Sequence, residues 1–411
     1  MKPWPQLREI TSSPRFQMWA AVAAAVGILV LRKPWALLTP QLWAEDGSVH
    51  LNDVDAWGAR AFLIPYRGYL HLLPRLIAWF APHVADVAHW PGIYNSAALV
   101  VTACLFARMA SPRLNLPGKP WMTLAFVLIP HSGEVFLNIT NLHWLADIFL
   151  VQQFLINRPA TTLQRVGDHL ALILAGLSDP CALVFLPLFV WRAWHDRDRD
   201  SVGMLVVVAL CAGIQGYFLR STGLHYDGPM QPFHLLRLLS VMGSRLVVWP
   251  FLGRHATSSL PAFSQALIGT AVVLVIVVWA LRRDPRRPVR ARILAAWALL
   301  AIGCLFRIRP DTWTVGLDNL SFAEPYFYAT RLLLVWVVIL EFSGPMRRVA
   351  WLARACCLIG VCLELPYYQQ PAPTNYHWAS HCDPIRRGVP AKIPILPDGW
   401  ILQYPGRPPQ K

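Results

Sequence analysis

Long runs of apolar residues, separated by shorter polar segments, repeat along the chain from Met18 to Leu365. A helix needs roughly 20 such residues to cross a bilayer. Because backbone inside lipid must satisfy its own hydrogen bonds, continuous apolar runs indicate helices, whereas a barrel would show alternation. The pattern predicts an all-α polytopic membrane protein with about eleven spans, at residues 18–38, 90–110, 120–133, 143–157, 168–178, 181–194, 201–220, 259–281, 291–307, 325–342 and 349–365.

The composition agrees with this fold class. The 411 residues are 55% hydrophobic and only 14% charged, whereas soluble domains carry about 25% charged residues. The mean hydropathy of +0.41 excludes an ordinary soluble enzyme and a disordered chain. Eight cysteines are present without a C-x-x-C spacing, and most lie in or beside apolar runs, so they predict small buried thiols and not a disulfide framework.

The charged residues behind the net charge of +15 are distributed unevenly between the loops on the two predicted sides of the membrane. If the N-terminus is cytoplasmic, the loops on that side hold more than half of the 37 Lys and Arg residues but about a third of the 22 acids. The short, acid-poor segment from Arg282 to Arg292 dominates this asymmetry, as the positive-inside rule expects. We therefore predict a cytoplasmic N-terminus, a transmembrane domain over residues 1–365 and a short exoplasmic tail over 366–411. No nucleic-acid-binding motif accompanies the charge, so membrane lipids are the expected partners.

Charged and polar residues that could take part in catalysis or binding are concentrated on the predicted exoplasmic side, first of all in the loop over residues 39–89. This loop opens with Trp43-Ala44-Glu45-Asp46-Gly47, an acidic pair directly after a span. Ionisable groups at the membrane edge often mark function. Glu45 and Asp46 are therefore candidates for a general base or a metal-binding carboxylate. The alternative is a solvated helix N-terminus, where the helix dipole favours acids.

The same loop contains an amphipathic stretch at residues 69–81 that is too short and too polar to span, which predicts an interfacial helix. Arg67, His71 and Arg75 recur every four residues and would share one side of a continuous helix. A row of cations there suits an anionic headgroup or a lipid-linked phosphate. Ordinary snorkelling of long cationic side chains is the alternative.

Further polar candidates lie beyond the first loop. The 3, 4, 3 spacing of His131, Glu134, Asn138 and Asn141 places them on one helical face, as a pocket wall or as a solvated loop helix. Arg331, at the outer end of the tenth span, is costly there unless a phosphate or an acid such as Glu324 pairs with it. The full set of pocket candidates is Tyr66, Tyr69, His71, His131, Glu134, Asn138, Asn141, His143 and Asp179.

This layout resembles the GT-C superfamily of integral membrane glycosyltransferases, which use polyprenyl-phosphate-linked sugars. The resemblance covers nearly the whole chain and rests on the long first exoplasmic loop, its opening acidic pair, its interfacial helices and the many spans that follow. The segments Trp43-Ala44-Glu45-Asp46-Gly47, Tyr66-Arg67-Gly68-Tyr69 and Pro397-Asp398-Gly399-Trp400 also look like those of uncharacterised bacterial membrane proteins with the same layout.

The resemblance implies transfer of a sugar, with inversion, from a polyprenyl-phosphate-linked donor to an exoplasmic glycan or lipid-linked acceptor. It gives the catalytic role to Asp46 or Glu45 and the donor phosphate to Arg67, Arg75 and Arg331. It implies a bacterial inner-membrane protein with an exoplasmic active face; no residue is assigned to a metal, although a divalent metal stays open as a cofactor. A lipid transporter or flippase, or a non-catalytic subunit of a polysaccharide assembly system, are the alternatives. No internal repeat favours a transporter.

Overall fold

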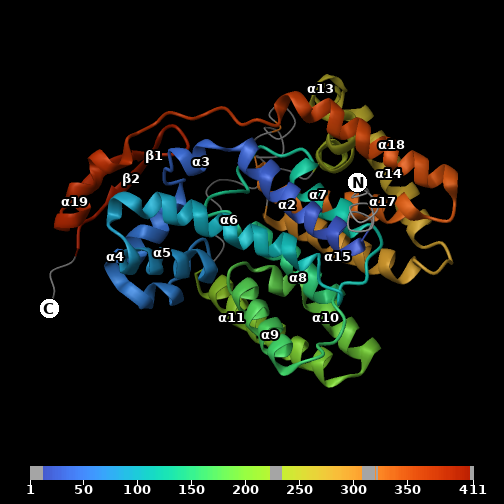
Figure 1. Ribbon diagram of the computed structural model, residues 1–411, viewed down its shortest axis with the longest axis horizontal. Coiled ribbons are helices and arrows are strands. Elements are labelled where there is room, and N and C mark those ends of the chain that lie inside the picture. Colours follow the sequence, from blue (N-terminus) through green and yellow to red (C-terminus); the bar gives the residue numbers. More distant parts are fainter. Residues whose placement is uncertain (1–12, 223–233, 308–319, 321–322, 408–411) are drawn as a thin grey trace, which may run out of the picture.

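A computed structural model describes residues 13–222, 234–307, 320 and 323–407 (Figure 1). The described chain is mostly helical, as the apolar runs predict, and its one sheet is a small antiparallel hairpin. The longer helices are α2 (Pro14–Arg32), α5 (Leu72–Val84), α6 (Trp90–Arg108), α7 (Lys119–Leu128), α8 (Leu142–Leu155), α9 (Thr162–Gly176), α10 (Cys181–Asp196), α11 (Arg199–Thr222), α12 (Leu235–Gly243), α13 (Trp249–Ser259), α14 (Ala262–Ala280), α15 (Arg287–Arg307), α17 (Glu324–Ile339) and α18 (Arg347–Glu364).

Short elements connect these helices and form the first loop and the tail. They are α3 (Trp35–Leu38), η1 (Asp46–Leu51), α4 (Asn52–Trp57), η2 (Gly58–Leu63), η3 (Val87–His89), η4 (Ser244–Val248), η5 (Leu340–Ser343), η6 (Leu365–Tyr367), η7 (Trp378–His381), α19 (Cys382–Arg387), β1 (Ala391–Ile395) and β2 (Trp400–Tyr404). Here η1 and η4 are π-helical and the other η elements are 3₁₀-helical.

A helix overlaps each of the eleven predicted ranges, and the helical content supports an all-α membrane-embedded protein. By length and composition, seven described segments could cross a membrane: Pro14–Arg32, Val87–Arg108, Arg199–Thr222, Leu235–Ser259, Ala262–Ala280, Glu324–Ser343 and Arg347–Tyr367. The helices α11, α14 and α18 expose large apolar side chains such as Leu210, Leu274 and Leu358, as lipid-facing helices do. By contrast, α17 is buried along most of its length.

One of the seven segments, Leu235–Ser259, is built of α12, η4 and α13, whereas the sequence predicts a loop between two spans there. The segment packs against α14 and α18. Gly360 of α18 lies against the backbone of Pro250.

The direction of this segment follows from its neighbours. Pro250 lies at Gly360 and Gly253 lies at Leu363, so the segment runs the same way as α18. The end of α14 meets the start of α18, where Arg282 contacts Met346, so α14 runs the opposite way. The segment therefore leads toward the start of α14, where Gln265 Nε2 donates to the Thr257 carbonyl oxygen at 2.6 Å.

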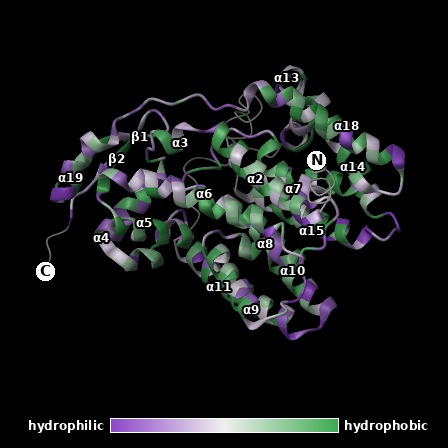
Figure 2. Ribbon diagram, viewed as in Figure 1, coloured by the Kyte–Doolittle hydropathy of each residue, from purple (hydrophilic) through white to green (hydrophobic). Residues whose placement is uncertain are grey.

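The two ends of the bundle differ in chemistry. At one end, which we call the arginine-rich end, arginines cross-link neighbouring turns: Arg113 pairs with Asp168 at 2.5 Å and Arg286 donates to the carbonyl oxygens of Leu340 and Ser343. The opposite, loop-rich end carries α4, α5, α19 and the β1–β2 hairpin (Figure 1). Figure 2 shows hydrophilic residues concentrated at such turns, with hydrophobic residues along the helices between them.

The C-terminal tail is folded against the first loop. In Figure 1 it leaves the end of α18 and returns to the loop-rich end as α19 and the hairpin. Leu396 pairs with the backbone on both sides of Trp43, and Tyr404 Oη donates to Asp55 at 2.5 Å. The start of α2 lies at the other end of the bundle, beside the 110–120 turn. The start of α2 and the β1–β2 hairpin therefore lie at opposite ends of the bundle.

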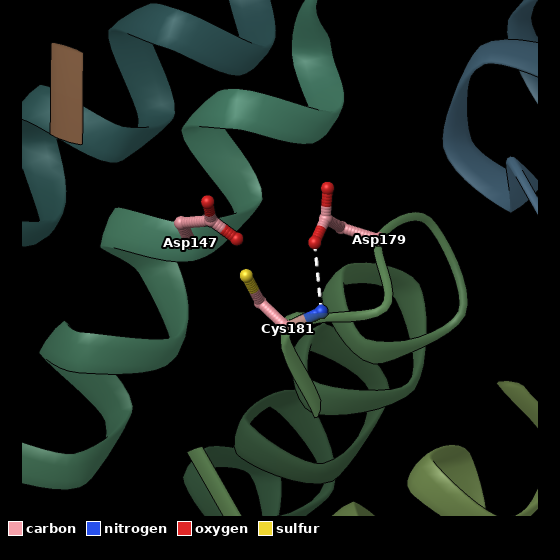
Figure 3. A group of neighbouring side chains, drawn as sticks. All are labelled: Asp147, Asp179 and Cys181. Atoms are coloured by element: carbon pink, nitrogen blue, oxygen red, sulfur yellow. Dashed lines mark hydrogen bonds between the residues drawn. The ribbon is translucent and has the colours of Figure 1, made fainter. Parts of the chain in front are cut away.

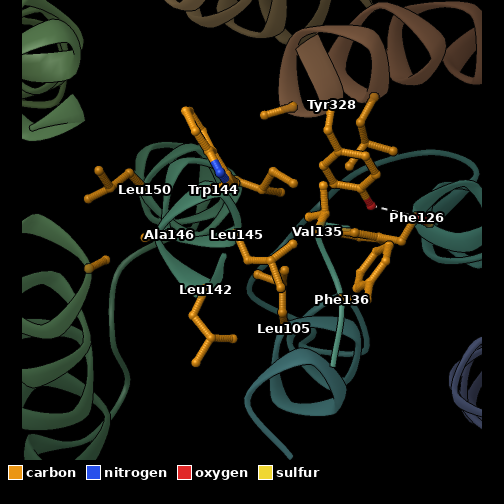
Figure 4. Close-up of a cluster of buried hydrophobic side chains, with 14 of the residues drawn as sticks. Leu105, Phe126, Val135, Phe136, Leu142, Trp144, Leu145, Ala146, Leu150 and Tyr328 are labelled. Carbon is orange, nitrogen blue, oxygen red and sulfur yellow. Dashed lines mark hydrogen bonds between the residues drawn. The ribbon is translucent and has the colours of Figure 1, made fainter. Parts of the chain in front are cut away.

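Between the ends, α7, α8 and α17 enclose a core of aromatic and aliphatic side chains (Figure 4). Tyr328 Oη of α17 donates to the carbonyl oxygen of Phe126 at 2.6 Å, and its ring packs edge-on against Phe136 with centroids 5.4 Å apart. Burying such rings is strongly favourable, and the hydrogen bond satisfies the one polar atom of Tyr328. This core fixes the loop-rich end of α17 beside the loop that precedes α8.

The predicted orientation gives a direct labelling result. In a chain whose native cysteines are replaced, Arg283→Cys lies in the turn after α14 and Ser380→Cys lies in the tail; both positions are exposed. We expect a membrane-impermeant thiol reagent applied to intact cells to label Ser380→Cys and to label Arg283→Cys only after permeabilisation. Labelling of both from outside would contradict the eleven-span interpretation.

Candidate functional site

Asp46, the first candidate carboxylate, points into the protein. It begins η1 directly after the Trp43–Leu396 pairing, and its side chain is fully buried. One carboxylate oxygen accepts from the Thr140 backbone N–H at 2.8 Å and from Thr140 Oγ1 at 2.6 Å, and the other accepts from the Trp43 N–H at 3.2 Å. Asp46 therefore ties the first loop to the loop before α8.

Burial raises the pKa of Asp46 to about 7, against its ordinary 3.8, although the three hydrogen bonds oppose the rise. The folded protein thus holds this proton more tightly than the unfolded chain does. The contribution of protonated Asp46 to the free energy of unfolding is complete below about pH 4 and is lost as the pH rises to about 7. Above that pH, Asp46 adds no further pH dependence to the stability.

We expect Asp46→Asn to remove this pH dependence. Between pH 5 and pH 8 the wild-type protein should lose up to about 3 kcal/mol of stability from this group, at about 1.4 kcal/mol per pKa unit. The measurement is thermal unfolding in detergent across that range. Asp398→Asn, on the exposed face of the tail, is the control and should keep the wild-type slope. An equal slope in Asp46→Asn and the wild type would contradict the assignment.

Glu45, its neighbour, points the other way. It is only partly buried, and its Oε1 accepts a hydrogen bond from Tyr66 Oη at 3.2 Å. Tyr66 and Tyr69 close a tight turn through mutual backbone hydrogen bonds of 2.9 and 3.2 Å. The tip of this turn is Arg67, which is exposed and has φ of 52°. The structure thus brings Glu45, Tyr66 and Arg67 together.

The predicted row of Arg67, His71 and Arg75 on one helix is wrong. The helix begins only at Leu72, because the Tyr66–Tyr69 turn takes the preceding residues. Arg75 is fully buried, pairs with Asp53 at 2.6 Å and donates to the carbonyl oxygens of the first loop. Of the three, Arg67 alone is exposed toward solvent or lipid headgroups.

The predicted helix that carries His131, Glu134, Asn138 and Asn141 is also wrong. Residues 130–141 are irregular, because Pro130 cannot continue the hydrogen-bonding pattern of α7 and two residues of the loop have positive φ. Side chains replace the helical hydrogen bonds. Both Asn138 Nδ2 and Asn141 Nδ2 donate to the carbonyl oxygen of Glu134, at 2.7 and 2.8 Å, as Asn side chains do in turns.

This loop nevertheless places Glu134 among charged groups. Glu134 is partly buried, and burial raises its pKa to about 7, with further contributions from Glu324 and Glu45 and an opposing one from Lys33. Lys33 Nζ donates to the carbonyl oxygen of Phe136 at 2.8 Å and so binds the end of α2 to the same loop. The loop-rich end therefore holds three neighbouring carboxyl groups, Glu45, Asp46 and Glu134, beside one buried lysine.

Arg331 lies in the interior. It is fully buried, pairs with Glu324 at 2.9 Å, donates to the Arg245 carbonyl oxygen at 2.9 Å and stacks 4.3 Å from the Trp249 ring centroid. Glu324 Oε2 also accepts from Ser132 Oγ at 3.1 Å. The predicted partner Glu324 is the one that the structure provides, and the pair joins α17 to the 130–141 loop.

Three histidines and two tyrosines stack beneath the Tyr66–Tyr69 turn. The His71 ring lies 4.3 Å from the Tyr69 ring, 5.7 Å from that of His50 and 5.5 Å from that of His143, measured between centroids. His143 Nδ1 lies 2.9 Å from Asp179 Oδ2. Burial lowers the pKa of His50 and of His71 well below the ordinary value, so both are neutral near pH 7.

Sequence reasoning missed several residues that build this region. His50 stands four residues after Asp46, a spacing that places both on one face of η1 and could have indicated it. Lys33, a cation at the end of the first apolar run, is buried, and its hydrogen bond to the 130–141 loop joins residues about 100 positions apart. Thr140 carries no signal of its own, because its role depends on a contact with a residue 94 positions earlier.

Two cavities formed by described residues lie apart from these side chains. One of about 730 Å³ lies at the arginine-rich end between the start of α2 and the 110–120 turn. The other, of about 210 Å³, lies between η1, α5 and α6 and is lined by Leu51, Trp79, Trp90 and Tyr94 among others. The second is the nearer to the candidate site, because η1 also carries Asp46 and His50.

The chain matches no protein-family model, no curated protein and no solved structure. Function is therefore inferred from the residues and geometry of the loop-rich end.

Proposed function

We propose that the protein is a membrane glycosyltransferase that moves a sugar from a polyprenyl-phosphate-linked donor to an exoplasmic glycan or lipid-linked acceptor, with inversion. The observation that carries the proposal is the grouping of a partly buried carboxylate, Glu45, with an exposed arginine, Arg67, on either side of Tyr66. An inverting transfer needs a base for the acceptor hydroxyl and a cation for the leaving phosphate.

In this mechanism Glu45 is the base. The acceptor oxygen attacks the anomeric carbon while the bond from that carbon to the phosphate oxygen breaks. The acceptor proton passes to the Glu45 carboxylate, and the polyprenyl phosphate leaves with the bonding electrons and is stabilised by Arg67. Asp46 is a positioning residue, because its oxygens accept three hydrogen bonds from the protein and fix the backbone on which Glu45 stands. Glu134 is the second carboxyl group of the site.

The positions of Arg75 and Arg331 support a narrower set of phosphate ligands than the sequence predicts. Both guanidinium groups are fully buried and paired with an acid, Arg75 with Asp53 and Arg331 with Glu324. A lipid-linked phosphate would have to compete with these carboxylates and enter the interior. Arg67 is exposed at the tip of the Tyr66–Tyr69 turn, where a phosphate can reach it without entering the interior, so we assign the donor phosphate to it alone.

We expect Arg67→Ala to weaken binding of polyprenyl phosphate about 10-fold, the order expected for one hydrogen bond to a charged group. Arg67→Lys should be intermediate, because it keeps the charge but loses the bidentate guanidinium. The measurement is a titration of the protein in detergent with polyprenyl phosphate itself. Arg60→Ala, an exposed arginine of η2 in the same loop, is the matched control. Equal affinities for all four proteins would remove Arg67 from the site.

A further inference from the structure

The larger of the two cavities lies at the arginine-rich end, opposite the loop-rich end that carries the proposed active site. The start of α2 forms one wall, and the end of α6 with the turn that leads to α7 forms the other. Its volume of about 730 Å³ is in the range of cavities that bind small molecules, roughly 300–1,000 Å³. The cavity can therefore hold a ligand much larger than a single phosphate ion.

The side chains of this cavity are positively charged. Arg15 of α2 and Lys119 of α7 both line it, and no Asp or Glu is among the described residues that do. Lys119 Nζ donates to the Ser111 carbonyl oxygen at 2.9 Å, which holds the ammonium group at the turn. An ammonium group has three N–H donors, so two remain for a ligand. Neither cation pairs with an acid of the described chain, so the cavity presents two uncompensated positive charges.

The backbone adds to this positive potential. The helices α2 and α7 both begin beside the cavity, and neither has an acidic residue in its first turn. The N–H groups of a first turn have no partner within the helix, and together with the helix dipole they attract anions. Side chains and backbone therefore favour a ligand of the same charge.

Other ionisable groups are, by contrast, occupied by partners within the protein. Arg113, in the same turn, pairs with Asp168 at 2.5 Å. Asp179, which lies beside Asp147 and Cys181 in Figure 3, accepts a hydrogen bond from the Cys181 N–H at 2.7 Å. A charge that already has a protein partner offers little to a ligand, so the two cations of the cavity are the more available.

Apolar side chains adjoin these cations. Met18, Trp19 and Leu116 line the same cavity. Trp19 is 56% exposed, and Trp121, in the first turn of α7, is 55% exposed. Exposed tryptophans of membrane proteins are enriched at the lipid–water interface, where their rings lie at the level of the headgroups. The ligand should therefore combine an anionic group with apolar groups and lie at the membrane surface.

We propose that this cavity binds one anionic phospholipid, whose headgroup phosphate contacts Arg15 and Lys119 and whose glycerol and first acyl carbons lie against Met18 and Trp19. Basic pockets between helices at the membrane edge hold anionic headgroups in this way. The lipid would join the start of α2 to the start of α7. This site is independent of the proposed sugar transfer, since none of its residues belongs to the loop-rich end.

The test uses the full-length protein purified in detergent and titrated with dioleoyl phosphatidylglycerol, with dioleoyl phosphatidylcholine as the zwitterionic comparison. We expect tighter binding of phosphatidylglycerol. Arg15→Ala and Lys119→Ala should each weaken it about 5-fold, and the double variant about 25-fold, the order expected for one cation each near an anionic headgroup. The double variant Arg283→Ala with Arg287→Ala removes the same charge from exposed positions outside the cavity and should keep nearly the wild-type affinity.

Two further measurements locate the lipid and identify its chemistry. Phosphatidylglycerol that carries a photoreactive diazirine near its glycerol should cross-link to residues 14–19 or 107–120, which form the walls of the cavity. Inorganic phosphate in large excess should not displace the lipid, because it lacks the groups that contact Met18 and Trp19.

Three outcomes of these experiments would overturn the proposal. Equal affinities for the two phospholipids would show that the cavity does not recognise charge. An equal loss of affinity in the cavity variant and the control double variant would show only a general attraction to the positive end. Displacement of the lipid by inorganic phosphate would identify a free phosphate as the ligand. If the cavity double variant does not fold, cross-linking of the wild type decides, because labels spread along α11, α14 and α18 would reject the site.

Discussion

Glu45→Gln is expected to lower the rate of sugar transfer about 10²–10⁴-fold, the usual contribution of a general base. Gln has nearly the same shape, and its amide oxygen can still accept the hydrogen bond from Tyr66 Oη, so the first loop should keep its fold. Only the capacity to take the acceptor proton is lost. Binding of polyprenyl phosphate, which depends on Arg67, should stay near the wild-type value.

The measurement is transfer in proteoliposomes supplied with a lipid extract that contains polyprenyl-phosphate-linked sugars. Asp46→Asn and Glu134→Gln are measured beside it, because each removes one of the neighbouring carboxylates that could take the role of Glu45. If Asp46→Asn abolishes transfer and Glu45→Gln does not, the roles of the acidic pair are exchanged. If all three variants transfer sugar at the wild-type rate, the proposed glycosyltransferase mechanism is wrong, and the transporter or assembly-subunit alternative takes its place.

The second large effect is on stability. Arg331→Ala should destabilise the protein by about 3–5 kcal/mol, because it leaves Glu324 as an unpaired charge in a site closed to water. It also removes the donor to the Arg245 carbonyl oxygen and the cation that stacks on Trp249. We expect a marked fall in the unfolding temperature in detergent and a low yield of folded protein.

The double variant Glu324→Gln with Arg331→Met should lose less stability than Arg331→Ala, since it removes both charges together. Arg386→Ala is the contrasting control: it breaks a pair with Asp86 of similar length, 2.6 Å, on the exposed surface, and should change the unfolding temperature little. A fully stable Arg331→Ala that binds polyprenyl phosphate weakly would instead return Arg331 to the phosphate site.

The sequence predicts the helices well and the site only in part. Apolar periodicity is a local property, so a helix overlaps each of the eleven ranges. The same reasoning fails at residues 130–141, where a 3, 4, 3 spacing of polar residues is satisfied by Asn side chains bonded to the backbone. It also fails at Leu235–Ser259, where the structure has helices in a segment that the sequence predicts as a loop.

The acidic pair shows what local pattern cannot decide. Glu45 and Asp46 are adjacent and chemically alike, and nothing near them in the sequence indicates which one is buried. The choice is made by Thr140, 94 residues later, and by the pairing of Leu396 with the backbone around Trp43. The carboxylate that is left facing Tyr66 is thus selected by contacts that only the folded chain contains.

The contact between the tail and the first loop has a consequence for biosynthesis. Asn52 Nδ2 donates to the Gln403 carbonyl oxygen across 351 positions, and Leu396 closes on Trp43 across a similar separation. The ribosome makes the first loop long before the strands that complete it. Contacts this distant in sequence form late. We therefore expect the backbone around Glu45 and Asp46 to stay incompletely folded until residues 391–404 have been made, so that the nascent chain acquires its site only after more than 300 further residues have been added.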